Sequence, residues 1–294
     1  MPSRFRMRKR GSGGGGSDAG VIFRVDHQAT SVGGTTYPMA YGASLASLLN
    51  LTVDTDNLGT EGGGNTWNWA HVGDGSGWNG RNYIRYTRWE DVDAAPNAGF
   101  FWDAATPAPA GGWVAKATAG PLYLRFRIRV VQSLTLSPTN PSAQMKFFLF
   151  GGPGISGERR MILFFERATD ATYGSGTDDD TEMTVRVGAG VSGNHAEATV
   201  PVGEWVHVQV SWRYTDAGSP YMRVYINNNT EGAPDAEHTT FTADSMGGVW
   251  SAIESWTTGH WHDLASSNSY TGTDFIADLM DFELGDAFNA SWAP

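Results

Sequence analysis

The segment Leu122–Val130 reads LYLRFRIRV and decides the fold class, because apolar side chains alternate strictly with charged or polar ones. Such alternation is typical of a β-strand with one buried face. The pattern returns in WVHVQVSW, Trp205–Trp212, and in YMRVYI, Tyr221–Ile226. Between these two lies TDAGSP, residues 215–220, whose composition favours a turn. The two segments are therefore predicted to form a β-hairpin.

Further strands are predicted along the rest of the chain, at Val21–Val25, Tyr83–Thr87, Gly99–Trp102, Met145–Phe150, Met161–Arg167, Met183–Val187, Glu197–Val200 and Phe275–Leu284. No internal repeat of fixed period is evident, which argues against a solenoid or a propeller. Many antiparallel strands without a repeat predict an all-β fold, a two-sheet antiparallel sandwich of jelly-roll type. Nothing linker-like interrupts residues 21–294, so we expect one domain there.

Residues 1–20 form a separate basic arm. Its basic side chains are Arg4, Arg6, Arg8, Lys9 and Arg10. A Gly-rich tether, GSGGGGS at residues 11–17, follows them. They are 5 of the 20 basic residues, and no acid precedes Asp18, so the rest of the chain carries 15 − 31, or −16 charges. An arm of this kind is expected to contact an acidic protein surface or a nucleic acid, because such attraction depends little on sequence.

The arm does not look like a secretory signal, because Gly-rich sequence follows the charges instead of an apolar stretch. We therefore expect synthesis in a cytoplasm. The alternative source of GSGGGGS is an engineered spacer, since Gly/Ser repeats are used as flexible linkers.

Composition excludes several classes of site and fold. The chain has no Cys, which rules out disulfides, thiolate metal sites and a Cys nucleophile. No apolar run approaches the ~18 residues that cross a bilayer, so no membrane partner is expected. The 12 Trp, 14 Phe and 10 Tyr are ample for a hydrophobic core.

The later strands resemble those of the concanavalin A-like jelly rolls, which include legume lectins, laminin-G-like modules, family 16 glucanases and several polysaccharide lyases. The segments that carry the likeness are VPVGEWVHVQVSWRY, YMRVYINNN and FIADLMDFELGD, with Gly203, Trp205, Val208, Tyr225, Asn227, Asp278 and Phe282 at the matching positions. The resemblance implies the fold, and it raises glycan binding as an expectation because the fold often binds glycans.

Two enzyme patterns of this superfamily can be checked in the sequence. The E-x-D-x-x-E spacing of family 16 glucanases is absent, and Glu90, Asp91 and Asp93 are expected in a loop. The Arg, His and Tyr strands of alginate lyases have counterparts in Arg125, His207 and Tyr225, although no Q-x-H motif is present. A charged, exposed sheet face is the favoured interpretation of these residues. A polysaccharide lyase or glycoside hydrolase acting through the three is the alternative.

Two aromatic groups are candidates for carbohydrate or interface contacts, because indole faces stack on sugar rings and on partner side chains. They are Trp250, Trp256 and Trp261, near His260 and His262, and Trp67, Trp69 and Trp78 in a Gly/Asn-rich stretch. The two histidines and Asp263 fall short of a metal ligand set. We expect no cofactor, with calcium at Asp178–Asp180 as the alternative to a solvated turn.

Together these features lead to the hypothesis of a non-enzymatic subunit of an assembly. Its concrete form is a bacteriophage virion protein made in the host cytoplasm, a capsid decoration or cement subunit. The basic arm would anchor it to an acidic capsid shell, and the jelly roll would face outward with glycan binding as an additional property.

Overall fold

The computed structural model describes the backbone of residues 21–24, 28, 31–32, 35–36, 39–41, 52–53, 67–88, 100–103, 120–132, 144–151, 161–167, 182–188, 195–213, 218–240, 255–258 and 275–292. Side chains are described for residues 28, 71–85, 120–131, 182–188, 195–213, 218–240 and 276–292. The basic arm, residues 1–20, lies outside the described residues, as do Trp250 and Trp261.

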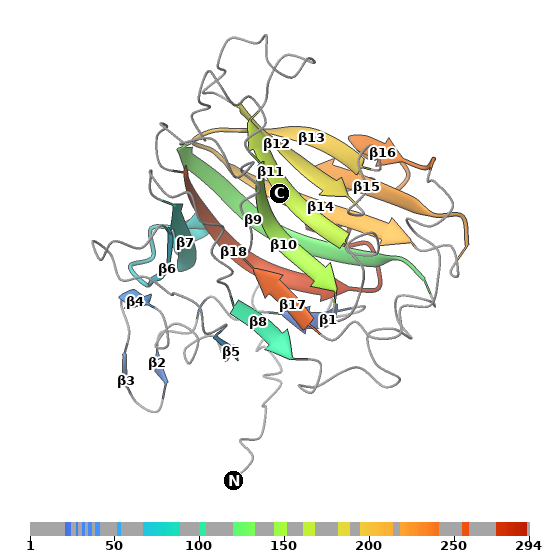
Figure 1. Cartoon of the computed structure of the whole chain (residues 1–294). Coiled ribbons are helices and arrows are strands. Elements are labelled where there is room, and N and C mark those ends of the chain that lie inside the picture. The colour runs from blue at the N-terminus through green and yellow to red at the C-terminus, as the bar shows by residue number, and fades with distance from the viewer. Residues whose placement is uncertain are drawn as a thin grey trace, which may run out of the picture.

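Two antiparallel sheets dominate the described part of the chain (Figure 1). The larger has nine strands in the order β16-β15-β14-β9-β18-β7-β6-β4, and β1 also pairs with β18. Its strands are β1 Val21–Arg24, β4 Met39–Tyr41, β6 Trp67–Val72, β7 Tyr83–Arg88, β9 Leu122–Gln132, β14 Trp205–Arg213, β15 Tyr221–Ile226, β16 Ala236–His238 and β18 Phe275–Gly285.

The smaller sheet has seven strands in the order β13-β12-β11-β10-β17-β8-β5. They are β5 Thr52–Val53, β8 Phe100–Asp103, β10 Gln144–Gly151, β11 Met161–Arg167, β12 Glu182–Gly188, β13 His195–Pro201 and β17 Ser255–Thr258. A separate pair joins β2, Ser31–Val32, to β3, Thr35–Thr36. Figure 1 shows β10 to β13 stacked in front of β9, β14 and β15. The chain is therefore an all-β, two-sheet jelly-roll sandwich.

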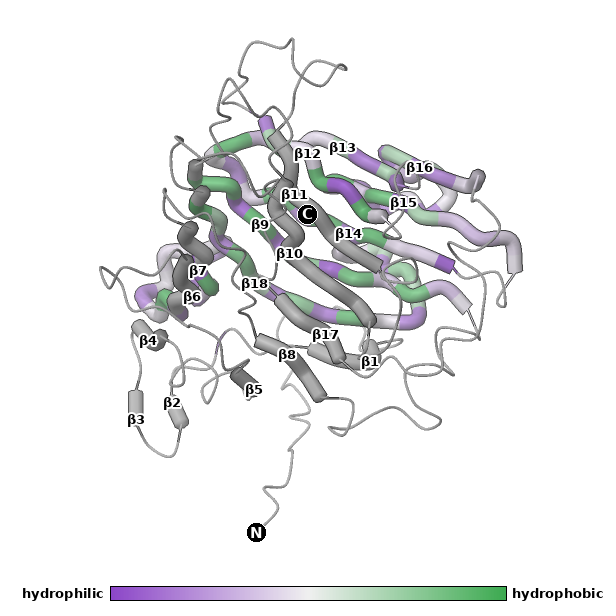
Figure 2. The backbone as a smooth tube through the Cα atoms, viewed as in Figure 1, coloured by the Kyte–Doolittle hydropathy of each residue, from purple (hydrophilic) through white to green (hydrophobic). Residues whose placement is uncertain are grey.

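The central strands show why the alternating segments fold in this way. In β9 the side chains of Leu122, Leu124, Phe126, Ile128 and Val130 are buried between the sheets. The register partners of the first four in β14 are also apolar, and Phe126 stacks on Phe282 of β18 with ring centroids 5.4 Å apart. Figure 2 shows the resulting alternation of hydrophobic and hydrophilic residues along these strands. The predicted hairpin is confirmed, since β14 and β15 pair from Val208↔Ile226 to Arg213↔Tyr221.

Strand β18 contains a bulge opposite Phe126. Met280 pairs with Arg127 and Glu283 pairs with Arg125, so two residues, Asp281 and Phe282, lie opposite one. Asp281 has a φ of 58°, in the left-handed region that Asp tolerates better than other side chains. The extra residue lets Phe282 enter the core while Asp281 and Glu283 both lie on the outer face.

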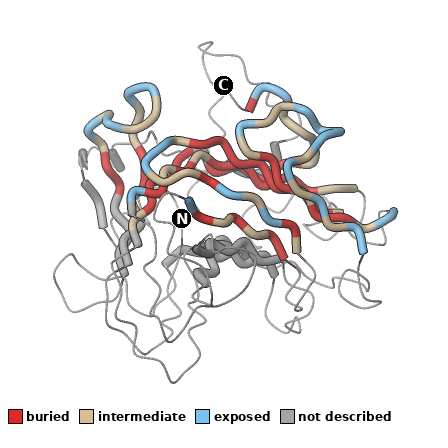
Figure 3. Tube along the Cα trace, turned by 90° about the horizontal axis from the view of Figure 1, so that it is seen from above, coloured by how far each residue is buried: buried red, intermediate tan, exposed pale blue. Residues whose placement is uncertain are grey.

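Figure 3 shows the described strands of the nine-stranded sheet as a nearly continuous buried layer, with exposed residues in the turns at its ends. No helix among the described residues is long and apolar enough to cross a membrane.

Candidate functional site

The outer face of the nine-stranded sheet carries the polar residues that alternate with the core. In β9 these are Tyr123, Arg125, Arg127 and Arg129. Their register partners in β14 are Ser211, Gln209, His207 and Trp205. The pairing with β18 adds the acids Asp278 and Glu283 opposite Arg129 and Arg125. Burial increases along the face from Arg129 to Arg125, so we describe it as three successive rows.

The first row is an arginine pair on one buried carboxylate. Arg85 of β7 donates to Asp278 from Nε at 2.7 Å and from Nη2 at 3.0 Å. Arg129 donates to Oδ2 of the same Asp278 from Nε at 3.0 Å and from Nη2 at 2.6 Å. These hydrogen bonds raise the pKa of Arg85 further above its usual value. Two guanidinium groups on one carboxylate leave one net positive charge in the row.

Aromatic rings flank the first row. The guanidinium carbon of Arg129 lies 5.1 Å from the centroid of the Trp205 ring and 5.9 Å from that of Tyr83. Arg85 lies 5.7 Å from the same Tyr83 ring. Trp78 and Trp205 are partly buried and pack against a small cluster made of Val72, Tyr83 and Met280. The row therefore combines cations with the faces of aromatic rings, an arrangement that cation–π attraction stabilises.

A tight loop between β6 and β7 delivers Trp78 and Arg81 to this face. The backbone N–H of Gly77 donates to the carbonyl of Arg81 at 2.9 Å, closing the loop. A Cβ at Gly77 would lie 2.5 Å from that carbonyl oxygen and 2.9 Å from Cδ1 of Tyr83, so a side chain does not fit there without movement. Gln28 holds the end of the loop through two 3.0 Å hydrogen bonds to the backbone of Asn82.

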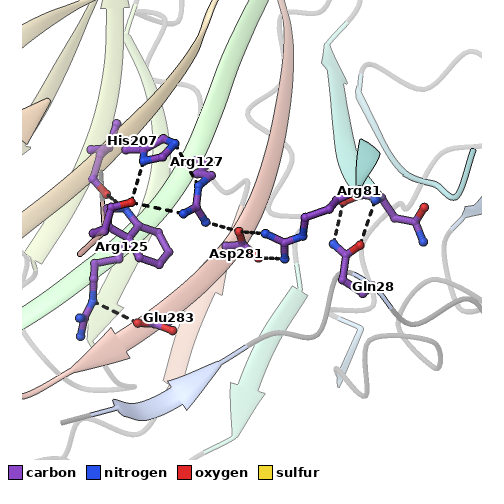
Figure 4. Close-up of polar contacts among 10 residues, drawn as sticks. Gln28, Arg81, Arg125, Arg127, His207, Asp281 and Glu283 are labelled. Carbon is purple, nitrogen blue, oxygen red and sulfur yellow. Dashed lines mark hydrogen bonds and ion pairs between the residues drawn. The ribbon is translucent and has the colours of Figure 1, made fainter. Parts of the chain in front are cut away.

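The second row is a chain of polar contacts from the loop to β14 (Figure 4). Asp281, the bulge residue of β18, accepts hydrogen bonds from Arg81 and from Arg127. Arg127 also donates from Nε to Nε2 of His207 at 3.1 Å. The rings of Trp78 and His207 make a T-shaped contact, with centroids 5.1 Å apart. Arg81, Asp281, Arg127 and His207 thus form one continuous network.

The hydrogen bonds of His207 define its tautomer. Nδ1 lies 2.6 Å from the carbonyl oxygen of Trp292, and a carbonyl can only accept, so Nδ1 carries the proton. Nε2 accepts from Arg127 and is therefore unprotonated. Burial, followed by the positive charge of Arg127, lowers the pKa of His207 to about 4. The imidazole is neutral at physiological pH.

The third row contains Arg125, Gln209 and Tyr225, and all three side chains are buried. Arg125 forms an ion pair with Glu283, with Nε 3.4 Å from Oε1. The Tyr225 hydroxyl donates to the carbonyl of Glu231 at 2.9 Å, and burial is the main cause of its raised pKa. The Gln209 side-chain oxygen accepts from the backbone N–H of Asn289 at 3.1 Å.

The chain beyond β18, residues 286–292, covers this row. The ring of Phe288 makes edge contacts with Tyr123 and Tyr225, with centroids 6.1 and 5.1 Å away. Trp292 is buried, donates from Nε1 to the carbonyl of Val208 at 3.1 Å, and lies under the Arg127 guanidinium at 4.5 Å. We call residues 286–292 the cover segment.

The residues expected from the sequence are placed as follows. Arg125, His207 and Tyr225 do share one face, as an enzyme site would require, but they are only 1%, 2% and 1% exposed. The expectation of an exposed charged face is therefore wrong for Arg125, because Glu283 pairs with it and it is buried. Arg85 and Arg129 stay partly exposed, and the region around them is the open part of the face.

The six tryptophans of the sequence analysis fall in different places. Trp67 and Trp69 lie in β6 of the larger sheet, a strand that is not among those predicted from the sequence. Trp256 lies in β17 of the smaller sheet. Trp78 is the member of the group whose side chain is described, and it reaches the outer face. A joint aromatic surface stays a prediction.

Several residues of the open face were not foreseen, namely Arg81, Arg85, Asp281 and the ionic role of Asp278. The sequence did contain a signal for the acids, because FIADLMDFELGD places carboxylates between apolar residues. The described side chains contain no group of three or more His, Asp or Glu residues that could hold a metal ion. The acids Asp178–Asp180, like Glu90, Asp91, Asp93, His260, His262 and Asp263, lie outside the described residues.

No protein-family model and no curated protein matches the chain. Among solved structures, the chain is similar to an endo-β-1,4-glucuronan lyase from the fungus Trichoderma reesei, with 14% identity over 82% of this chain and 100% of that chain and a TM-score of 0.44. A marine PL7 alginate lyase from Zobellia galactanivorans shows 10% identity over 70% of this chain and 78% of the other, with a TM-score of 0.40.

The binding domain of botulinum neurotoxin serotype G is similar over 92% of this chain and 49% of that chain, at 9% identity and a TM-score of 0.42. At these TM-scores and identities, the likenesses carry no conclusion about the activity or ligands of this chain.

Proposed function

We propose that the protein binds an acidic carbohydrate on the open part of the outer face. The observation that carries the proposal is the cluster of partly exposed arginines and indole rings at Trp78, Arg81, Arg85, Arg129 and Trp205. Indole faces pack against sugar rings, and guanidinium groups pair with carboxylate or sulfate groups. The structure places both kinds of group side by side.

The local charge supports this choice of ligand. Four arginines of the first two rows, Arg81, Arg85, Arg127 and Arg129, contact two aspartates, Asp278 and Asp281, which leaves an excess of two positive charges. The whole chain has a net charge of −11, which repels polyanions at long range. Screening limits that repulsion to about 8 Å at physiological ionic strength, so the local excess decides binding at contact.

Binding is favoured over lyase chemistry because the candidate catalytic groups are engaged elsewhere. A lyase needs a base within reach of a sugar proton. His207 is hydrogen bonded at both ring nitrogens, and the Tyr225 hydroxyl donates to a backbone carbonyl. Both side chains are buried. The face therefore supports recognition of a glycan without cleavage.

The test compares binding with cleavage in one experiment. Isothermal titration with oligogalacturonate and with neutral dextran measures binding, and the ultraviolet absorbance of an unsaturated product reports cleavage. We expect binding of the acidic oligomer alone, weakened at least several-fold by Trp78→Ala, with no product. Formation of product that His207→Gln abolishes would instead establish the lyase alternative. Absence of binding to any acidic glycan would refute the proposal.

The basic arm supports a second role, anchoring to an assembly. We propose that residues 4–10 attach the jelly roll to an acidic surface such as a capsid shell, as in a virion decoration protein. The support is the contrast between five basic residues in the arm and −16 charges in the remainder. A version starting at Asp18 is expected to lose salt-sensitive pelleting with capsids that the full chain shows. Equal behaviour of the two versions would remove this proposal and leave carbohydrate binding unaffected.

A further inference from the structure

The first row has unequal numbers of positive and negative groups. Asp278 accepts four hydrogen bonds, two from Arg85 and two from Arg129, and its side chain is fully buried. The two arginine side chains remain 36% and 25% exposed. Each arginine uses Nε and Nη2 toward Asp278, and neither Nη1 forms a hydrogen bond with the described residues. Donors and one net positive charge therefore remain available.

We infer that Arg85 and Arg129 form a subsite for one carboxylate of the bound sugar, with Asp278 holding the two guanidinium groups in position. This inference rests on the proposed binding of an acidic carbohydrate and specifies a polyuronate as its class. A second carboxylate would balance two cations with two anions. Arginine pairs with a planar carboxylate through parallel N–H donors, which gives the subsite its preference for that group.

The neighbouring rings place the rest of the sugar. Trp205 and Tyr83 lie beneath the Arg129 guanidinium, and this stacking restricts the guanidinium plane. A side chain already held by Asp278 and by two rings loses little rotamer freedom when a ligand binds. The partly buried Trp205 then borders the position of the sugar ring whose carboxylate meets Arg85 and Arg129.

Matched variants and matched ligands test the subsite. Arg85→Gln and Arg129→Gln each remove one cation from the row. Arg223→Gln removes an equal charge from the same sheet face, where Arg223 is also 25% exposed but pairs with Glu237 and stacks on Tyr221. Oligogalacturonate and its methyl ester differ in the charge of the carboxyl group and in one added methyl group per sugar. Dextran sulfate carries sulfate esters, the anionic group that would compete with a carboxylate for this subsite.

Titration calorimetry is expected to show at least about tenfold weaker oligogalacturonate binding for Arg85→Gln and Arg129→Gln, as for loss of a charge-assisted hydrogen bond. Arg223→Gln should stay within about twofold of the wild type. The methyl ester should bind at least about tenfold more weakly than the free acid, and dextran sulfate more weakly per charged group than oligogalacturonate.

Asp278→Asn separates ligand binding from a purely structural role. Its amide oxygen still accepts a hydrogen bond from the arginines and keeps them in position, while the row gains one net positive charge, so the variant should weaken the fold yet tighten binding of the acidic oligomer several-fold. Weaker binding by a folded Asp278→Asn would refute the charge balance on which the subsite rests. Should this variant fail to fold, the two arginine variants decide the question alone.

The outcomes distinguish this inference from the broader proposal. If the wild type binds oligogalacturonate but the methyl ester binds equally well, or if Arg85→Gln and Arg129→Gln behave like Arg223→Gln, the subsite is refuted and carbohydrate binding stands. Stronger binding of dextran sulfate would assign the subsite to sulfate esters and overturn the polyuronate class. If the wild type binds no acidic glycan, both proposals fall.

Discussion

The network around His207 makes folding stability depend on pH in a defined direction. The pKa of His207 falls from an ordinary value of 6.5 to about 4 because the ring is buried and faces Arg127. Below pH 6.5 the unfolded chain therefore binds a proton at this site that the folded chain does not. Lowering the pH from 6.5 to 4 must destabilise the fold, and below pH 4 this contribution levels off.

The size of the effect follows from the two pKa values. The free energy of unfolding should fall by about 2 kcal/mol between pH 7.5 and pH 5, and by about 3 kcal/mol at pH 4. The comparison variant is His207→Gln, whose amide can donate to the Trp292 carbonyl and accept from Arg127 without titrating. Urea unfolding of both proteins at pH 7.5, 6, 5 and 4 isolates the contribution of His207, because other titrating groups are common to both.

We expect the wild type to lose stability relative to His207→Gln as the pH falls through this window. Nitrogen NMR of the imidazole should show the Nδ1–H tautomer at neutral pH, with an apparent pKa of about 4. Parallel stability curves for the two proteins, or an NMR titration near pH 6.5, would refute the reasoning.

Three further predictions concern the support of the site. Gly77→Ala should lower the free energy of unfolding by about 1–3 kcal/mol in urea, because the new Cβ meets the Arg81 carbonyl. Gly120→Ala and Gly232→Ala are the controls, since nothing lies within 4 Å of a Cβ there, and they should differ from the wild type by less than about 1 kcal/mol. Equal losses of stability in all three variants would contradict the packing argument. Trp292→Ala should lower the free energy of unfolding by about 3–5 kcal/mol and speed proteolysis of the cover segment. The control Trp292→Phe loses mainly the indole hydrogen bond, which is worth about 1 kcal/mol. An unchanged Tm for Trp292→Ala would show that the segment does not stabilise the sheet. Glu283→Gln should lower the free energy of unfolding by about 3–5 kcal/mol, because it removes the carboxylate that pairs with the buried Arg125. The double variant Arg125→Met with Glu283→Gln should lose less stability than the two single variants added together. Strict additivity in this double-mutant cycle would mean that the pair is not coupled.

The fold was predictable because it rests on local alternation. Leu122–Val130 and Trp205–Trp212 each place an apolar residue at every second position, and that period fixes both the strand and its buried face. The strands β7, β10, β11 and β12 were also found within about two residues of their bounds. In contrast, β6 was not predicted, because Gly and Asn residues precede it and the strand is only 6 residues long.

The site was predictable only in part, because it depends on pairings between distant segments. Alternation placed Arg125 and His207 each on the polar face of its own strand, and the structure pairs these two strands so that both residues lie on one face of the sheet. Alternation could not show that Arg85 and Asp278 face each other across 193 residues, or that Trp292 returns to contact Val208 and His207. Those contacts decide which arginines stay open and which are closed.

The bulge at Asp281 makes strand β18 one residue longer than the stretch of β9 that it faces. Removing Asp281 would restore simple alternation with both faces unchanged: Phe282 would still lie opposite Phe126 in the core, and Glu283 would still lie opposite Arg125 on the outer face. The deletion would take away the carboxylate that joins Arg81 to Arg127. In a library of natural or designed variants, a gap at Asp281 should therefore be compatible with the fold and should disconnect the loop between β6 and β7 from β14.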